Sequence, residues 1–319
     1  MSTSAPETDV LVIGGGPAGL AAATGLVRQL HTVILFDSGK YRNWMSKHMH
    51  NVPSWDHRDP AEFRRISRED LISHYETASI ENTEITSIKE IEGGFEVGDA
   101  NGRLWSGKKV ILATGVEERF PEIDGYKENW GRTIFHCMFC HGYEQRGGDS
   151  GVLCVQFAAA MPQMAMNVAR HASQLSNSVV MYTNGDEALE KTLIDLIGGS
   201  INKIRTDSRK IKRLVAADPG ITVEFEDGSS VTKSFLAHAP NTVPRGPLVQ
   251  QLGLKTGGPF EDIEVSQPWL QTSTKGVFAA GDNMVMAKAV APAMHNGGIA
   301  CVAATLQLQA EKHGHPSMV

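Results

Sequence analysis

DVLVIGGGPAG, residues 9–19, is the stretch that predicts the fold class of this chain. Residues 9–13 form a largely apolar, β-branched run, as expected for a strand buried on both faces of a parallel sheet. Gly14, Gly16 and Gly19 follow with the spacing G-x-G-x-x-G. The first glycine permits a tight turn, the second lets a pyrophosphate approach the backbone, and the third lets the next helix pack on the strand.

The residues after this stretch extend the same pattern. The helix that begins at the glycine turn points its N-terminal N–H groups at the phosphates of a ligand. A second apolar strand, residues 31–36, ends at Asp37, which is placed to bind a ribose hydroxyl. A strand before the glycines, a helix after them and an acid about 20 residues on together predict a dinucleotide-binding α/β domain.

Composition excludes several classes of protein. A chain of 319 residues is long enough for about two domains. Its formal charge of −6, without a basic run, argues against nucleic-acid binding. Residues 1–9 do not resemble a targeting peptide, and no apolar run approaches the roughly 18–20 residues of a membrane span. With only four cysteines, a disulfide scaffold is not expected. We expect a cytoplasmic protein with no membrane or nucleic-acid partner.

Two further motifs indicate which dinucleotide is bound. Residues 109–115 form a buried strand that ends in Ala-Thr-Gly, and residues 274–282 form another that ends in Gly-Asp, before a helix that opens around Pro292. The set GGGPAG, ATG and GVFAAGD resembles the FAD domain of flavoprotein disulfide reductases. The resemblance implies that the aspartate contacts the flavin ribitol chain and that the next helix N-terminus stabilises negative charge on the reduced flavin.

Within this family the chain resembles low-molecular-weight thioredoxin reductases. The expected fold is α/β, with two Rossmann-like domains, each a three-layer ββα arrangement. Residues 1–116 and 241–319 would form a discontinuous FAD-binding domain. Residues 117–240 would form a central domain that carries the redox cysteines on a degenerate NADPH-type fold. The two crossings are expected near residues 116–121 and 239–246, which are rich in turn formers.

The stretch HCMFCHGYE, residues 136–144, contains the candidate catalytic group. Cys137 and Cys140 have the Cys-x-x-Cys spacing and occupy the place of the family's redox pair. A zinc site that His136 and His141 would complete is the alternative, but a structural site usually takes two ligand pairs, and no second pair is present. Cys154 and Cys301 lie in apolar runs and are expected to be buried and inert. We expect no metal.

The central domain departs from the reductase pattern. After the strand at residues 150–156 the chain continues as FAAAMPQM, without the glycine turn that lets a pyrophosphate approach. The next strand, residues 178–183, ends in Asn-Gly-Asp-Glu, where reductases carry arginines for the NADPH 2′-phosphate. We therefore expect no NADPH site.

The residue after the second cysteine is a further departure. Reductases have an acid at the position of His141. A histidine side chain, which ordinarily titrates near pH ~6.5, accepts a thiol proton near neutral pH. His136 is the second candidate base, and the sequence does not indicate which of the two faces the disulfide.

These departures resemble the dithiol oxidases of gliotoxin-type and holomycin-type pathways, which share the thioredoxin reductase fold and close a disulfide in a small natural product. HMHNVPSWDHRDPAEFR, from residue 48, is similar to a flavin-domain segment of that subfamily; a His48-x-His50 metal pair is the competing interpretation. The resemblance implies that FAD contacts Gly14, Gly16, Pro17, Ala18, Gly19, Asp37, Ser38, Arg42, His50, Asn51, Ala113, Thr114, Gly115, Gly281, Asp282, Ala289 and Val290.

The function expected is an FAD-dependent dithiol oxidase. It would form an intramolecular disulfide in a small-molecule dithiol, such as an epidithiodiketopiperazine, and pass electrons to O₂ to give H₂O₂. The main alternative is a thioredoxin reductase-like enzyme with a non-NADPH electron donor such as ferredoxin. A redox sensor with structural FAD and an NAD(P)H-dependent oxidoreductase with an unorthodox pocket are also considered. The resemblance implies a homodimer.

Overall fold

The described residues of the computed structural model, 8–198 and 203–319, form two compact units. The first contains the described part of Met1–His48 together with Val52–Glu117 and Thr242–Val319. The second contains Met49–Asn51 and the described part of Glu118–Asn241. Nothing in the sequence indicates that Met49–Asn51 belongs with the second unit.

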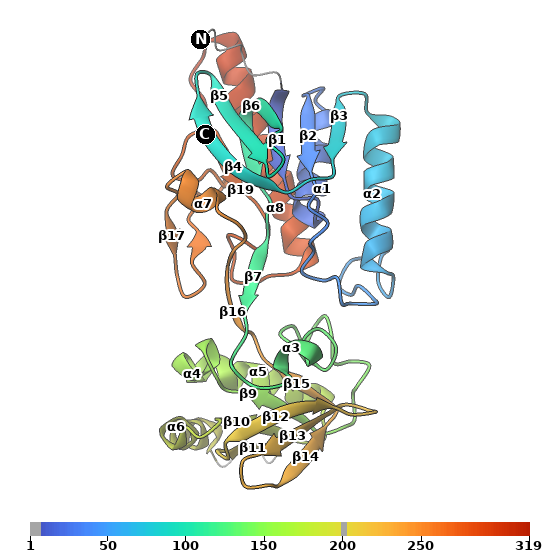
Figure 1. Cartoon of the computed structure of the whole chain (residues 1–319), viewed down its shortest axis with the longest axis vertical. Helices are drawn as coiled ribbons and strands as arrows, with labels where there is room; N and C mark the ends of the chain where they lie inside the picture. Colours follow the sequence, from blue (N-terminus) through green and yellow to red (C-terminus); the bar gives the residue numbers. More distant parts are fainter. Residues whose placement is uncertain (1–7, 199–202) are drawn as a thin grey trace. The chain divides into compact units, whose positions relative to one another are not determined.

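The first unit is built on one mixed sheet (Figure 1). Its elements are β1 (Thr8–Ile13), α1 (Pro17–Val27), β2 (Val33–Phe36), α2 (Pro60–His74), β3 (Ala78–Glu81), β4 (Ile85–Ile91), β5 (Gly94–Asp99), β6 (Leu104–Leu112), α7 (Leu248–Gln251), β17 (Thr256–Gly257), β18 (Asp262–Ile263), β19 (Val277–Ala279) and α8 (Val290–His313). The strand order is β3-β2-β1-β6-β5-β4, and β19 also pairs with β6.

The long strand β6 belongs to two layers of this unit. Its C-terminal half pairs in parallel with β1 and β19, whereas its N-terminal half pairs antiparallel with β5. The buried apolar strands predicted at residues 9–13 and 31–36 are therefore central strands, covered on one face by α1 and α8 and on the other by the β4–β5 hairpin.

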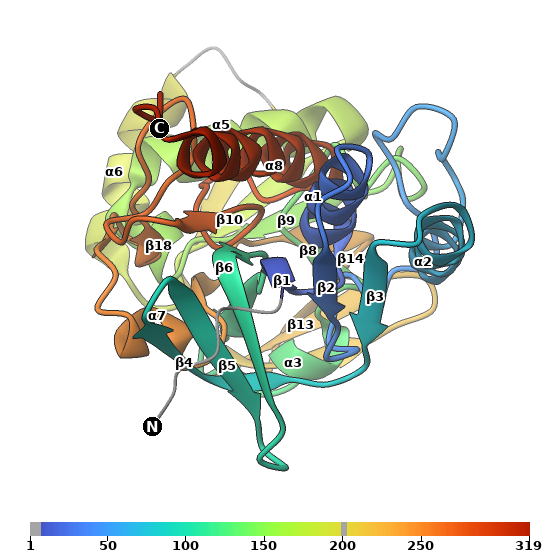
Figure 2. The same cartoon turned by 90° about the horizontal axis from the view of Figure 1, so that it is seen from above.

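Helices α1 and α8 run side by side over the sheet (Figure 2). Small residues permit this close approach, because a Cβ added at Gly297 would lie 2.1 Å from the Ala18 carbonyl oxygen. The packing brings the N-terminus of each helix to the edge of the sheet where the parallel strands end.

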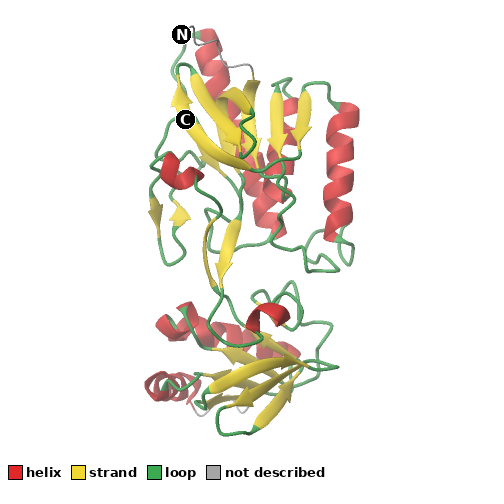
Figure 3. Ribbon diagram, in the orientation of Figure 1, coloured by secondary structure: helices red, strands yellow, loops and turns green. Residues whose placement is uncertain are grey.

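The second unit repeats the three-layer arrangement (Figure 3). Its elements are α3 (Tyr126–Asn129), β8 (Ile134–Phe135), β9 (Ser150–Leu153), α4 (Phe157–Ala160), α5 (Pro162–Leu175), β10 (Val179–Tyr182), α6 (Glu187–Ile197), β11 (Ile204–Asp207), β12 (Ile211–Ala216), β13 (Ile221–Phe225), β14 (Ser230–Lys233) and β15 (Phe235–Ala237). The parallel sheet has the order β11-β10-β9-β15-β8, with α5 and α6 on one face and the antiparallel sheet β12-β13-β14 on the other.

The chain passes between the units through β7 (Val116–Arg119) and β16 (Asn241–Pro244), which pair with each other. Both lie in the segments where the sequence predicts the crossings. The expected α/β class with two Rossmann-like domains is confirmed.

Candidate active site

The two cysteines of the HCMFCHGYE stretch form a disulfide in a tight turn that follows β8. The Cα atoms of Cys137 and Cys140 are 5.2 Å apart. The Cys137 carbonyl oxygen accepts hydrogen bonds from the backbone N–H of Cys140, at 3.1 Å, and of His141, at 3.0 Å. Both cysteines are half-buried, so exposure does not rank them for attack by a thiolate. We call residues 137–141 the redox turn.

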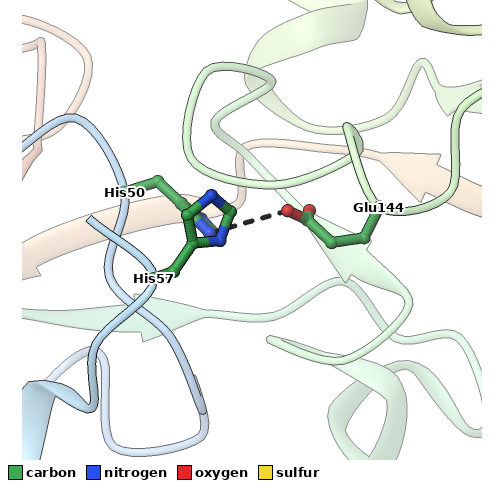
Figure 4. A group of neighbouring side chains, drawn as sticks. All are labelled: His50, His57 and Glu144. Carbon is green, nitrogen blue, oxygen red and sulfur yellow. Dashed lines mark ion pairs between the residues drawn. The ribbon is translucent and has the colours of Figure 1, made fainter.

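The tripeptide Met49–Asn51 lies on the redox turn. Asn51 Nδ2 donates to the Phe139 carbonyl oxygen at 2.6 Å, and His50 Nδ1 lies 2.9 Å from the Cys140 carbonyl oxygen. His50 Nε2 lies 3.5 Å from Glu144 Oε1 (Figure 4). The sequence predicts a place near the flavin for His50 and Asn51, which stays a prediction. The sequence did not predict that His50 and Asn51 contact the redox turn, or that Glu144 pairs with His50. The partners are about 90 residues apart in the chain.

The two candidate bases lie in different surroundings. His141 is half-buried, and its ring lies against the Phe135 ring, with ring centroids 5.1 Å apart. Burial lowers the pKa of His141, the charge of His50 lowers it further, and Glu144 opposes both effects. His136 stacks on Trp130, with centroids 5.9 Å apart. Because its pKa is lowered, His141 is neutral at neutral pH and can accept a proton.

In the first unit, the glycine loop has the geometry that the motif predicts. Gly14 has φ +124°, and a Cβ at Gly19 would lie 1.8 Å from the Gly14 carbonyl oxygen, so a side chain is excluded at both positions. Gly16 is different, because no described atom lies within 4 Å of an added Cβ. Pro17 and Ala18 open α1, whose N-terminus has no side-chain cap among the described residues. Its N–H groups are therefore available to a phosphate.

Asp37 lies beside this loop. Its carboxylate accepts hydrogen bonds from the Gly39 N–H at 2.9 Å and from the Tyr41 hydroxyl at 2.6 Å, and it also pairs with Arg68 on α2. Burial and the Asp37 charge raise the pKa of Tyr41 to about 12, so the hydroxyl keeps its proton and donates. Tyr41 and Arg68 were missed, because no motif marks them.

The remaining predicted cofactor residues meet at the same edge of the sheet. Ala113–Gly115 follows β6 and Gly281–Asp282 follows β19, and these two strands are paired in parallel. Asn283 Nδ2 donates to the Leu112 carbonyl oxygen at 2.9 Å and joins the two loops. Arg42 Nη1 lies 3.2 Å from Asp282 Oδ2. Ala289 and Val290 open α8, which also lacks a side-chain cap among the described residues.

These residues fit a flavin dinucleotide. The space at Gly16 and the uncapped N-terminus of α1 suit a pyrophosphate, and the N-terminus of α8 suits a group that gains negative charge. Asn283 Oδ1 is buried without a hydrogen-bond partner among the described residues. The fit concerns this edge of the sheet, and contacts of the single residues with FAD stay predictions.

The second unit has no glycine turn after β9. Instead Gln156 adopts φ +52° and ψ −127°, and its side chain bonds the two crossings: Nε2 donates to the Arg119 carbonyl oxygen at 2.8 Å, and Oε1 accepts from the Asn241 N–H at 3.2 Å. After β10, Asp186 caps α6 by accepting from the Leu189 N–H at 2.8 Å. The positions that would receive a nucleotide thus hold a side-chain amide and an acidic helix cap.

The two other cysteines are buried and free, as predicted. Burial raises the pKa of Cys154 to about 12 and also raises that of Cys301. Neither thiol is ionised near neutral pH, so neither competes with the redox turn.

Comparison with known proteins identifies the family. The model of the pyridine nucleotide-disulphide oxidoreductases matches residues 8–298. The chain belongs to this family. It is similar to a protein named thioredoxin reductase tcpT from Claviceps purpurea, with 45% identity over 100% of this chain and 99% of that protein. It is also similar to thioredoxin reductase aclD from Aspergillus oryzae, with 41% identity over 96% and 98%.

A solved structure supports the same assignment. The crystal structure of a protein named HlmI is 30% identical, covers 98% of this chain and 96% of its own, and has a TM-score of 0.83. Pyridine nucleotide-disulphide oxidoreductases of the thioredoxin reductase type are flavoproteins that contain FAD. The chain is therefore a flavin-dependent oxidoreductase with a role in disulfide chemistry. Among the described residues, no helix is long and apolar enough to cross a membrane.

Proposed function

We propose that the enzyme is an FAD-dependent oxidase that forms an intramolecular disulfide in a small-molecule dithiol, an epidithiodiketopiperazine or a similar compound. The electrons pass through the Cys137–Cys140 pair to O₂, which becomes H₂O₂. The observation that carries the proposal is the combination of this disulfide with the Gln156 side chain in place of the glycine turn. A thiol–disulfide site without a nucleotide turn suits electron flow from dithiol to flavin.

FAD is assigned to the edge of the sheet in the first unit. The glycine loop and the start of α1 would hold the pyrophosphate, Asp37 the ribose, and the Gly281–Asp282 loop with the start of α8 the flavin end. Bound FAD supplies the two-electron oxidation that restores the disulfide and transfers the electrons to O₂.

The chain's own residues perform the exchange with the dithiol. By analogy with the redox pair of the family, one substrate thiolate attacks Sγ of Cys137, which forms a mixed disulfide and releases Cys140 as a thiolate. The second substrate thiol gives its proton to His141, and its sulfur attacks the first substrate sulfur. This step closes the cyclic disulfide and releases Cys137, so the substrate has lost two electrons and the cysteine pair has gained them. A lowered pKa suits His141 to this role, because a neutral ring is needed to accept the proton. His136 is the alternative base.

The absence of NADPH from the reaction is part of the proposal. Gln156 has a positive φ, a backbone conformation usually occupied by glycine. Its side-chain amide forms hydrogen bonds with both crossings. A pyrophosphate at this place would have to displace those bonds. The acid at Asp186 would also repel a phosphate.

The second candidate is a thioredoxin reductase-like enzyme with a donor other than NADPH. The names of the relatives favour it, since they are called thioredoxin reductases. The two functions predict opposite electron flow. A homodimer belongs to the proposal as well.

The test is an aerobic assay of the FAD-loaded enzyme with reduced, gliotoxin-like dithiols. We expect one O₂ consumed and one H₂O₂ formed for each disulfide made, and no consumption with NADPH alone. The variant Cys154→Ser is the matched control, because this thiol is buried away from exchange. Absence of O₂ uptake with dithiols, together with reduction of thioredoxin by reduced ferredoxin, would establish the second candidate instead.

A further inference from the structure

The contact of His50 with the redox turn settles which ring nitrogen carries a proton. The partner of Nδ1 is the Cys140 carbonyl oxygen, at 2.9 Å, which can only accept. His50 Nδ1 must therefore be the donor. The other nitrogen, Nε2, then faces the Glu144 carboxylate at 3.5 Å, and an ionised carboxylate also only accepts (Figure 4). A ring that carries protons on both nitrogens satisfies both partners.

The pair is built into the second unit from two distant segments. The His50 side chain is 13% exposed, whereas Glu144 is 43% exposed and lies three residues after His141 on the same loop. Asn51, the neighbour of His50, holds the Phe139 carbonyl oxygen. Two successive carbonyl groups of the redox turn are thus held by two successive residues of Met49–Asn51.

We propose that His50 and Glu144 form an imidazole–carboxylate pair that positions the redox turn and sets the pH range in which His141 accepts the substrate proton. His50 and Glu144 are positioning residues, since they act through the turn and through His141. The inference rests on the proposed role of His141 as the base.

The charged groups that act on His141 come from two segments. His50, on Met49–Asn51, disfavours a proton on His141, and Glu144, on the loop after the redox turn, favours one. From β8, the Phe135 ring contributes no charge. Because a positive His50 lowers the pKa of His141, the neutral base persists to lower pH than burial alone would allow.

The first test is an NMR titration of the FAD-loaded enzyme with ¹³C-labelled histidine, in which His141→Gln assigns the His141 signal. His50→Gln keeps a side-chain donor for the Cys140 carbonyl oxygen and removes the charge. We expect the His141 midpoint to rise by about half a pH unit or more. Glu144→Gln on the His50→Gln background is expected to lower it again. His50→Lys, which retains a positive donor, is expected to keep the midpoint near that of the unaltered enzyme.

The matched controls are His48→Gln, directly before Met49–Asn51 in the chain, and Glu226→Gln, an exposed acid paired with Lys210. Neither is expected to move the His141 midpoint. An unchanged midpoint in His50→Gln overturns the proposal. An equal shift in His48→Gln also overturns it, because the two histidines would then act as one site, as a metal pair would.

A second measurement needs no variant and serves if His50→Gln does not fold. Ring ¹H–¹⁵N spectra of the unaltered enzyme are expected to show His50 Nδ1 protonated throughout the titration, and a bare Nδ1 would contradict the inference. Neither readout involves dithiol turnover. A failure of dithiol oxidation with the expected shifts would therefore reject the proposed function alone. If turnover occurs, its acid limb is expected to move with the His141 midpoint.

Discussion

At the scale of single residues, three positions of the redox turn have separate tasks in the proposed function. Cys137 and Cys140 form the disulfide to which we assign electron transfer, and the backbone N–H groups of Cys140 and His141 close the turn on the Cys137 carbonyl oxygen. His141 follows the second cysteine directly, so its ring is fixed by the same turn. The proposed chemistry therefore depends on a segment of only five residues, 137–141.

The first prediction separates the two sulfur atoms. Cys140→Ser leaves Cys137 as a thiol that can attack a cyclic disulfide but has no partner to resolve the adduct. We expect this variant to accumulate a mixed disulfide with added product, seen as a mass increase in intact-protein mass spectrometry. Cys137→Ser is expected to accumulate little, and both should lose multiple turnover. Adduct on Cys137→Ser instead would reverse the assignment of the two sulfurs.

The second prediction concerns the base. His141→Ala is expected to keep FAD and the disulfide but to slow dithiol oxidation by about 10²-fold at neutral pH. The pKa of His141 is lowered in the folded enzyme, so the neutral base is present at neutral pH and is lost as pH falls. The defect should shrink as pH rises toward the thiol pKa of the substrate, where thiolate forms without help. Full activity of the variant at all pH values would point to His136.

At the scale of elements, strand ends and helix starts form the proposed cofactor site. The parallel strands β1, β2, β6 and β19 bring loops from distant parts of the sequence to one edge of the sheet. Helices α1 and α8 start at that edge because small residues let them pack closely. The second unit also has a parallel strand followed by a helix, at β9 and α4, but no glycine turn joins them.

A substitution in the glycine loop tests this arrangement. Gly16 has φ −80°, which any residue adopts, and the space beside it is open to 4 Å among the described atoms. Gly16→Val should therefore fold and yet lose FAD, because the side chain occupies the path of the pyrophosphate. Flavin absorbance and circular dichroism measure the two effects. Gly298→Val, also in open space on α8, is the control and should retain FAD.

The end of β15 gives a prediction about pH and stability. His238 is 2% exposed, and its Nδ1 lies 2.7 Å from the Tyr126 hydroxyl. Burial lowers the pKa of His238 to about 4. Unfolding restores a pKa near ~6.5, so the unfolded chain binds the extra proton and stability is lost as pH falls from about 6.5 to about 4. The loss is about 3 kcal/mol.

Urea unfolding at several pH values measures this dependence. His238→Gln keeps an acceptor for the Tyr126 hydroxyl and does not titrate. The variant should be less dependent on pH over that window than the unaltered protein. Equal dependence in the two proteins would show that His238 is already protonated in the fold.

At the scale of the whole molecule, two three-layer units of similar architecture differ in the loops that follow their parallel strands. The first has a glycine loop with open space, and the second has Gln156 and the Asp186 cap at the corresponding strand ends. The family model matches residues 8–298, a range that contains parts of both units. The proposal that the enzyme does not bind NADPH rests on this difference between the loops.

The last prediction follows from this difference. Under anaerobic conditions, micromolar NADPH should leave the flavin absorbance of the enzyme unchanged, because Gln156 replaces the glycine turn after β9 and the acidic Asp186 caps α6 after β10. A gliotoxin-like dithiol should bleach the flavin under the same conditions. Rapid bleaching by NADPH would contradict the proposal and restore the reductase function.

The fold class, the glycine loop and the pairing of Cys137 with Cys140 could be predicted from the sequence, because each depends on short-range spacing. Apolar runs mark buried strands, glycines mark the tight turn, and two intervening residues let Cys137 and Cys140 meet. These patterns hold wherever the segment lies in the chain. The buried state of Cys154 and Cys301 was predictable for the same reason, since each lies in an apolar run.

The surroundings of the redox turn and the contacts between the two crossings required the tertiary structure. His50 meets Cys140 across 90 residues, Asn51 meets Phe139 across 88, and Gln156 meets Asn241 across 85. Such pairs form when separate packed elements bring two loops together, and no local pattern encodes their partners. Spacing along the chain thus specified the cysteine pair, whereas long-range packing specified the imidazole that contacts the redox turn and the carboxylate beside it.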